Sequence, residues 1–590
     1  MFKKKKEAEL NRNSLLSAGI CFLVLNLYMF LRFRWGMFDI YCPTFQLNLL
    51  GKVSQYGSIV DHVGIPGIPF NYHYLPSLIA SIFVNLGFTK ILSLYFAITL
   101  GLNFTFLIII LYSRKLIYNL KKLKNISGFL FLLTCLFSSS GYVFTLLYPY
   151  VGYWSKYLSI AEYAFSFSFP YAFLLLSIQF ILLRNPRLYK NSSNNLNISD
   201  NRKYRYLVSS FITIIFPYIN PTVFVVSSLS QVLYFFKELF LIKNPIIKNK
   251  FKNKLSLFFV LCLPILVAVI LSKYFIISAF FVSELYERPI TSIGPKRFYD
   301  IFMFVILLAP TFYLSIITLP TKINLEKISI HLITAIISFI FPFIIYVEGI
   351  GFWDNTHKYV LIASFASIFI LIDNLTILTE FKNPRYYENY IFGIFVLKTQ
   401  RGSFRKRMIN SKIIFIIIFT LNIFLSLPSL TNQFIDRMSG QNIFAYTREI
   451  SNISDSFSKY LLNIKLIYKN QKVLFVPLWS SGMCDNFMDI VSTNNNFYAL
   501  GAYPPNSPFL LSKKIEDNNA FLLNNRHDFN RIKTTYPNHK IIYISNNNFL
   551  DISNDNLYEI EFKKTLEKKG SLGQYTIYSF NQMKSVNSIQ

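Results

Sequence analysis

Long apolar runs recur from residue 14 to residue 428 and are separated by short polar segments. The hydrocarbon core of a bilayer is about 30 Å thick, so a helix that crosses it requires roughly twenty apolar residues. Helices satisfy their own backbone hydrogen bonds, as lipid demands. The pattern therefore predicts a polytopic α-helical membrane protein. Eleven spans are predicted, at residues 14–33, 91–112, 126–148, 163–183, 206–220, 222–241, 255–276, 300–318, 329–347, 357–378 and 412–428.

Two segments near the amino terminus need separate interpretation. Four lysines at positions 3–6 precede the run 14–33, which is long for a signal-peptide core and has no small-x-small cleavage site after it. It is therefore interpreted as an uncleaved signal anchor. Residues 76–88 are predicted to form a juxtamembrane or partly inserted helix at the outer face. A full crossing there would place the basic segment 114–125 outside, against the positive-inside rule.

The net charge of +30 would suggest nucleic-acid binding in a soluble protein, but here its distribution is a topology signal. The predicted inner segments hold 31 Lys and Arg, whereas the outer segments hold 7. This asymmetry places the amino terminus in the cytoplasm. The composition, which is typical of a low-GC bacterial genome, and the lack of a eukaryotic retention signal indicate the inner membrane of a bacterium. Because charge also guided the choice of spans, it is a consistency check. The inner segments are residues 1–13, 114–125, 184–205, 242–254, 319–328 and 379–412.

The composition changes near residue 430. Strand-like runs at 472–476, 540–544 and 574–578 alternate with polar stretches, which predicts an α/β domain. The expected organisation is a transmembrane module over residues 1–429, with a long first outer loop at 34–75, and an extracytosolic α/β domain over residues 430–590. The sequence contains no GxGxxG and no P-loop.

Ionisable residues of the predicted outer side stand close to the ends of spans. Asp39 follows the first span by a few residues, and capping the next helix is an equally good interpretation of its position. Such groups have the right placement to converge in a water-filled cleft that faces bound lipid. The others considered as site residues are Asp61, His73, Glu162, Arg288, Lys296, Arg297, Asp354, His357 and Lys358.

At this point the chain resembles the GT-C superfamily of integral-membrane glycosyltransferases. The resemblance rests on a basic cytoplasmic amino terminus, Asp39 after the first span and a long first outer loop that ends in Tyr72-His73-Tyr74-Leu75-Pro76. Asp354-Asn355-Thr356-His357-Lys358 is similar to the start of a late helix in that family. Gly57, Asp61, Gly64, Pro66 and Pro69 add to the likeness of the loop.

The resemblance implies transfer of a hexose or pentose from a polyprenyl-phosphate carrier to a glycan, lipid or protein acceptor outside the cytoplasm. By position, Asp39 is the general base that takes the acceptor's proton, and the transfer inverts the anomeric carbon in one displacement. Cations stabilise the departing phosphate. The candidates for this role are Lys296, Arg297, His357, Lys358 and Arg288, while Asp61, Glu162, His73 and Asp354 are acceptor-binding or auxiliary residues.

The sequence departs from the family in the first loop, where many members pair two acids. Asp39 has no adjacent carboxylate, and the next acid of the loop is Asp61. The missing acid pair weakens the case for a metal cofactor, and the sequence does not require one. If a divalent cation binds, Asp39 and Glu162 are the oxygen ligands to test.

Several alternatives stay open. A transporter or flippase of a lipid-linked saccharide is the second hypothesis, although the sequence shows no clear inverted repeat. Lys296 and Arg297 equally fit as interfacial anchors that touch headgroups. His331 lies inside a span near its cytoplasmic end, and we expect it to pack or form a hydrogen bond between helices.

Overall fold

The computed structural model divides the chain into two compact units, Met1–Arg32 with Ile98–Ser439 and Phe33–Ala97 with Gly440–Gln590. The structure describes residues 2–34, 50, 53–54, 61–62, 65–69, 75–120, 125–138, 159–163, 168–184, 198–240, 259, 262–271, 308–319, 328–344, 351–380, 415–427, 472–477, 497–499, 529–546, 558–566 and 575–582.

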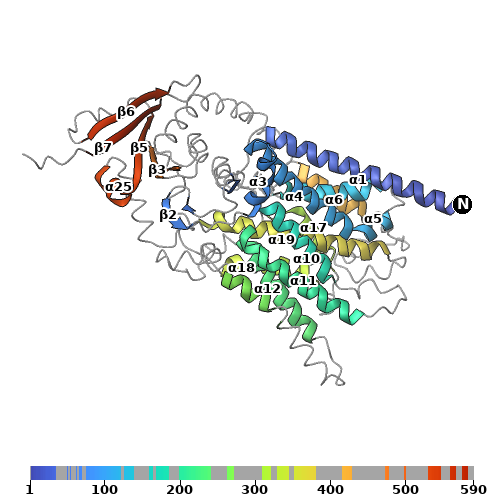
Figure 1. The fold of residues 1–590 in the computed structure, drawn as a ribbon. Coiled ribbons are helices and arrows are strands. Elements are labelled where there is room, and N and C mark those ends of the chain that lie inside the picture. Colours follow the sequence, from blue (N-terminus) through green and yellow to red (C-terminus); the bar gives the residue numbers. More distant parts are fainter. Residues whose placement is uncertain are drawn as a thin grey trace, which may run out of the picture. The chain divides into compact units, whose positions relative to one another are not determined.

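The first unit is a bundle of helices (Figure 1). Its members are α1 (Phe2–Arg34), α4 (Lys90–Tyr112), α5 (Arg114–Leu120), α6 (Asn125–Phe137), α9 (Ile160–Tyr163), α10 (Phe169–Leu183), α11 (Ile198–Ile219), α12 (Pro221–Phe240), α17 (Pro310–Ile317), α18 (Ile330–Ile344) and α19 (Gly351–Glu380). The last residues of α1 and the first turns of α4 fall in the second unit. Two further apolar helices cover Cys262–Leu271 and Phe415–Leu427.

Helix α19 is the core of this bundle. Apolar side chains lie on all its sides, and Leu361, Ile362, Phe365 and Phe369 are fully buried. Helices α5, α12, α17 and α18 all contact it. A helix that is apolar all round must be surrounded by other helices, which is the position that α19 occupies.

The outer helices of the bundle expose apolar side chains. Leu15 and Leu23 of α1 are 73% and 69% exposed, and Phe424 of the helix Phe415–Leu427 is 71% exposed. Exposed apolar surface of this kind fits contact with acyl chains better than contact with water. Within the described part of the chain, two helical segments, Leu92–Tyr112 and Lys358–Thr379, are long and apolar enough to cross a membrane.

Each of the eleven predicted spans contains a helix. Several of these helices are shorter than a bilayer crossing, such as α6 and α17, and the remaining residues of those spans lie outside the described residues. The chain is therefore mostly helical in the described part of its first unit, as predicted. The number of membrane crossings stays a prediction.

A close approach of backbones joins α4 to α10. A Cβ atom at Gly101 would lie 2.8 Å from Cβ of Pro170, so only glycine fits there without a shift. The hydroxyl of Thr105 donates a hydrogen bond to the carbonyl oxygen of Pro170 at 3.0 Å. Small residues that permit such contacts are common between helices in membranes.

The second unit contains a short hairpin, a helix and a mixed sheet. Strands β1 (Asp61–His62) and β2 (Ile65–Pro69) pair antiparallel, and α3 (Leu75–Asn85) follows them. The five-stranded sheet has the order β4-β3-β5-β7-β6. Its strands are β3 (Lys472–Pro477), β4 (Phe497–Ala499), β5 (His539–Asn546), β6 (Tyr558–Leu566) and β7 (Tyr575–Gln582), and α25 (Phe529–Thr535) precedes β5.

Strand β3 is an interior strand of this sheet, with a parallel neighbour on each edge. It pairs with β4 and β5 in parallel, while β7 pairs antiparallel with β5 and β6. Residues 473–476 of β3 are fully buried, as expected for an apolar strand in a parallel sheet. The three strand-like runs of the sequence lie in β3, β5 and β7. Strand β2 contacts β4, so the predicted first loop and the carboxyl-terminal region share this unit.

Candidate functional site

Half of the predicted site lies outside the described residues. The general-base candidate Asp39, His73 and the cations Arg288, Lys296 and Arg297 all belong to this group. Their roles stay predictions, as does a divalent cation held by Asp39 and Glu162. No group of three or more His, Cys, Asp or Glu side chains that would hold a metal occurs among the described residues.

The backbone positions of the other candidates are described. Asp61 lies in β1, opposite Pro69 of β2, and Glu162 lies in α9. Asp354, His357 and Lys358 lie in the first turns of α19, which begins at Gly351. The spacings of three and four residues place Asp354, His357 and Lys358 on one face of this helix.

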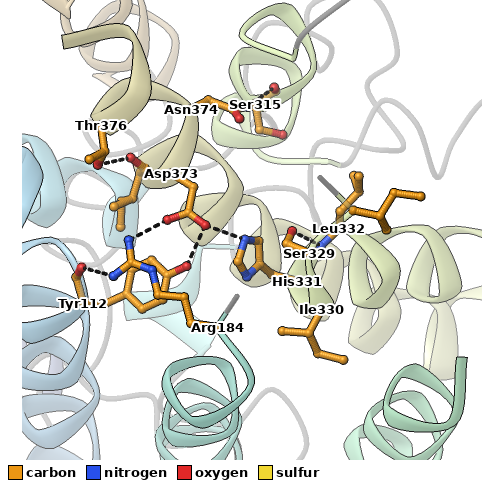
Figure 2. A network of polar contacts seen from close by, with 12 residues as sticks. Tyr112, Arg184, Ser315, Ser329, Ile330, His331, Leu332, Asp373, Asn374 and Thr376 are labelled. Atoms are coloured by element: carbon orange, nitrogen blue, oxygen red, sulfur yellow. Dashed lines mark hydrogen bonds and ion pairs between the residues drawn. The ribbon is translucent and has the colours of Figure 1, made fainter. Parts of the chain in front are cut away.

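The charged group that the structure does bring together is centred on Asp373, deep in α19 (Figure 2). One carboxylate oxygen lies 2.7 Å from Nη2 of Arg184. The other accepts a hydrogen bond from the Tyr112 hydroxyl at 2.8 Å and lies 3.0 Å from Nε2 of His331. We call these four residues the Asp373 cluster.

Arg184 joins two helix ends within this cluster. It directly follows α10, and its Nη1 donates a hydrogen bond to the carbonyl oxygen of Tyr112, the last residue of α4, at 3.0 Å. Its guanidinium carbon lies 3.9 Å from the centre of the Tyr112 ring. A cation at a helix carboxyl terminus satisfies carbonyl groups that have no partner within the helix, and stacking on an aromatic face adds to this.

His331 is the second residue of α18 and is 1% exposed. Aromatic rings of Tyr112, Phe180 and Phe369 surround its imidazole. Its Nδ1 is buried and has no hydrogen-bond partner in the described part of the chain. Nε2 of His331 is the nitrogen that donates a hydrogen bond to the carboxylate of Asp373, at 3.0 Å. This confirms the expectation that His331 forms a hydrogen bond between helices.

Within the Asp373 cluster the carboxylate of Asp373 pairs with the guanidinium of Arg184. A carboxylate in an apolar bundle is costly unless it is paired and its lone pairs are occupied. Three donors from different helices meet this requirement here. The carboxylate of Asp373 is therefore fully partnered, which suits a fixed structural element better than an acid or base in catalysis.

The Asp373 cluster lies at one end of the bundle. Tyr112, Arg184 and His331 each stand at a helix end, next to the segments 114–125, 184–205 and 319–328. These three segments are predicted to lie on the same side of the membrane. Their proximity at the cluster agrees with the predicted alternation of the spans, while the assignment of that side to the cytoplasm stays a prediction.

A second buried group is polar but uncharged. Gln179 of α10 donates to the carbonyl oxygen of Ser209 at 3.0 Å and accepts from Ser227 at 2.6 Å. Gln231 of α12 donates to Thr213 of α11 at 2.7 Å. Every one of these contacts joins two of the helices α10, α11 and α12, and such hydrogen bonds hold helices together in lipid.

Sequence reasoning named His331 but missed its partners. Asp373 is an acid within an otherwise apolar predicted span, 357–378, and Arg184 is the first charge after another span. An acid inside a span is expected to pair with a cation or a hydrogen-bond donor at the same depth in the membrane. The sequence therefore indicated that Asp373 has such a partner. Which of the many cations provides the partner depends on which helices are neighbours.

Comparison with known proteins gives little further information. No protein-family model matches the chain, and no curated protein sequence matches it. Among solved structures, the crystal structure of ArnT from Cupriavidus metallidurans in the apo state is similar, with a TM-score of 0.46 and 9% sequence identity. The alignment covers 95% of this chain and 97% of that chain. A likeness at this level carries no conclusion about activity.

Proposed function

We propose that the chain is a membrane glycosyltransferase of the GT-C type, which transfers a sugar from a polyprenyl-phosphate carrier to an acceptor outside the cytoplasm. The observation that carries the proposal is the amino end of α19. There Asp354, His357 and Lys358 follow one another at helical spacing in the first turns of α19, at the end predicted to face outward. The resemblance of the first outer loop to the family supports the proposal separately and names Asp39 as the general base.

In this mechanism the acceptor hydroxyl attacks the anomeric carbon of the sugar. The new bond joins the acceptor oxygen to this carbon, and the bond from the carbon to the phosphate oxygen breaks. Asp39 takes the hydroxyl proton, and the polyprenyl phosphate leaves with the electron pair. A single displacement inverts the configuration and needs no covalent intermediate with the protein.

Cationic side chains stabilise the charge that develops on the departing phosphate. His357 and Lys358 come from α19, while Lys296, Arg297 and Arg288 precede the span predicted at 300–318. Asp61, His73, Glu162 and Asp354 are left to orient the acceptor or the sugar. If a divalent cation takes part, Asp39 and Glu162 are its proposed ligands, since carboxylate oxygens suit such ions.

The proposed setting is the inner membrane of a bacterium, with the amino terminus in the cytoplasm and the α/β domain outside. Exposed apolar side chains on α1 and on the helix Phe415–Leu427 support insertion in a bilayer. The α/β domain is proposed to act on the acceptor, which is a glycan, a lipid or a protein.

A transporter or flippase of the same lipid-linked saccharide is the second candidate. The buried charges of the Asp373 cluster are a feature that transporters often show. Substrate and ion sites of transporters, however, lie near the middle of the membrane. Tyr112, Arg184 and His331 stand at helix ends, so the cluster does not favour transport over transfer.

The proposal is tested by mass spectrometry of lipids that the purified protein retains, followed by a transfer assay with the carrier found. Asp39→Asn is expected to keep the lipid and to lose transfer by about 10²- to 10⁴-fold, because a general base contributes about that much. Glu7→Gln, in the predicted cytoplasmic tail, is the matched control and should transfer normally. Retained carrier that crosses a bilayer without sugar transfer in the unsubstituted protein would instead identify a flippase.

A further inference from the structure

The rotation of α19 poses a packing problem. Apolar side chains cover its whole circumference, so apolar contact alone does not distinguish one rotation or depth from another. In helical assemblies a buried polar residue is the best-attested device for selecting one register. The polar contacts of α19 are therefore expected to select its rotation and depth, which its apolar contacts do not select.

These polar contacts reach several neighbours from the carboxyl-terminal half of α19. Asp373 binds α4, α10 and α18 through Tyr112, Arg184 and His331. On the next position, Nδ2 of Asn374 donates to the hydroxyl of Thr318, directly after α17, at 3.2 Å. Near the helix end, Thr379 accepts a hydrogen bond from Asn119 of α5 at 3.0 Å.

Together these contacts determine both the rotation and the depth of the helix. A slip of α19 by one residue would turn it by about 100° and move it by about 1.5 Å. Asp373 would then leave Arg184 and place its carboxylate among the buried phenylalanines, which costs several kcal/mol. Among the polar contacts of α19, those of Asp373 therefore oppose a change of register most strongly.

The amino end of α19 lies far from the Asp373 cluster, so a small tilt of the helix at the cluster displaces that end by several ångströms. Nineteen positions separate Asp354 from Asp373, or about 28 Å at the rise of an α-helix. A tilt of about 10° around Asp373 would displace Asp354 by about 5 Å. Displacements of about 1 Å in an active site can lower the rate about 100-fold.

We propose that the Asp373 cluster positions α19, and with it the amino-terminal turns that carry Asp354, His357 and Lys358, the residues assigned above to binding of the lipid-linked donor. The first part of this proposal concerns the register of α19 and stands without any assigned activity. The second part, on the donor, rests on the proposed glycosyltransferase function. Asp373, Arg184, His331 and Tyr112 are positioning residues in this scheme, since they act through α19.

A purely stabilising cluster makes a different prediction, and an apolar variant separates the two. Replacing a buried ionic group by apolar residues of similar size is often neutral for stability. The variant combines Tyr112→Phe, Arg184→Met, His331→Leu and Asp373→Leu. It removes every polar contact of the cluster but keeps packing volume, so the bundle is expected to fold while α19 loses its selected register.

The register is read by cysteine labelling in the full chain, in which the five native cysteines are replaced by serine. Positions 355 and 357 are separated by about 200° of rotation around the axis of α19, so Asn355→Cys and His357→Cys report two different faces of the helix. The ratio of their labelling rates by a membrane-impermeant maleimide therefore reports rotation. We expect the apolar variant to shift this ratio toward position 355 and, when cysteine is absent from both positions, to lose sugar transfer.

An unchanged ratio in the folded apolar variant would overturn the proposal. If the apolar variant does not fold, a matched pair at position 331 replaces it. The side-chain amide of His331→Gln reproduces the Nε2–H donor, whereas that of His331→Asn reaches only the position of Nδ1. The ratio should stay normal in the first and shift in the second, and equal ratios would refute the positioning role.

The transfer assay keeps the two parts distinguishable. A shifted labelling ratio together with loss of transfer supports both parts. A shifted ratio in a protein whose unsubstituted form transfers no sugar supports the register of α19 and overturns the glycosyltransferase function. A shifted ratio with an unchanged KM for the lipid donor and an unchanged kcat would overturn the link between register and donor.

Discussion

The substitution Asp373→Asn tests whether buried charge, and not hydrogen bonding alone, holds the end of the bundle. Asparagine keeps the size of the side chain but removes the charge that faces Arg184 at 2.7 Å. Removing one partner of a buried ion pair costs about 3 to 5 kcal/mol. The Arg184 side chain is 21% exposed, so solvent partly screens the ion pair. We therefore expect the free energy of unfolding to fall by about 3 kcal/mol, the lower end of this range.

Tyr112→Phe is the control, because it removes a hydroxyl that donates to the same carboxylate at 2.8 Å and leaves both charges. Because the acceptor is a charged carboxylate, we expect a loss near the upper end of the values for hydrogen bonds between membrane helices, about 1.7 kcal/mol. Both values are measured by reversible unfolding in mixed detergent and SDS micelles, followed by circular dichroism.

The double variant Arg184→Gln with Asp373→Asn completes a thermodynamic cycle. It should be less destabilised than the sum of the single variants by about 1 to 3 kcal/mol, since residues in contact couple to that extent. Equal losses for Asp373→Asn and Tyr112→Phe, with no coupling to Arg184, would show that the charge of Asp373 is not compensated by the guanidinium and would refute the reasoning.

Three further predictions concern other parts of the molecule. Gly101→Ala should destabilise the bundle by about 1 to 3 kcal/mol, because the new Cβ would crowd Pro170. Gly19→Ala is the control and should not destabilise the bundle, since no atom lies within 4 Å of its new Cβ. Thermal unfolding of both variants checks this prediction. Lys358→Gln should raise the KM for the lipid donor more than it lowers kcat, with Lys327→Gln as a control from the opposite side. Deleting the residues after 430 removes β4, which contacts β2, and should abolish sugar transfer. Mass spectrometry of the retained lipids should still find the donor. Loss of both transfer and retained donor would place donor binding in the second unit.

The local sequence predicted the helices closely where composition alone decides them. Residues 91–112 and 222–241 were predicted as spans, and α4 and α12 cover Lys90–Tyr112 and Pro221–Phe240. In lipid a long apolar segment has no alternative to a helix, because its backbone groups must find partners within it. The three strand-like runs of the carboxyl-terminal region were predicted for a similar reason, since buried β-strands are rich in apolar and β-branched residues.

Helix ends were less predictable because they depend on capping and on neighbours. The span predicted to start at residue 163 contains α10, which begins at Phe169 with Pro170 in its first turn. Proline fits the first turn of a helix, where its missing N–H costs nothing, and this local rule places the start better than apolar content does. Helix α19 likewise does not begin at the predicted start of the apolar run. It begins at Gly351, six residues before the run was predicted to enter the membrane.

The sequence by itself determined that this chain forms many apolar helices and an α/β region, because those features follow from residues that are neighbours in the chain. Only the tertiary structure decided that Asp373 meets Arg184, His331 and Tyr112, which are 189, 42 and 261 positions away. Their meeting depends on which helices adjoin α19 and on how it is rotated. A helix that is apolar on every side carries no pattern that encodes either, so the few polar groups within it make that choice through three-dimensional contacts.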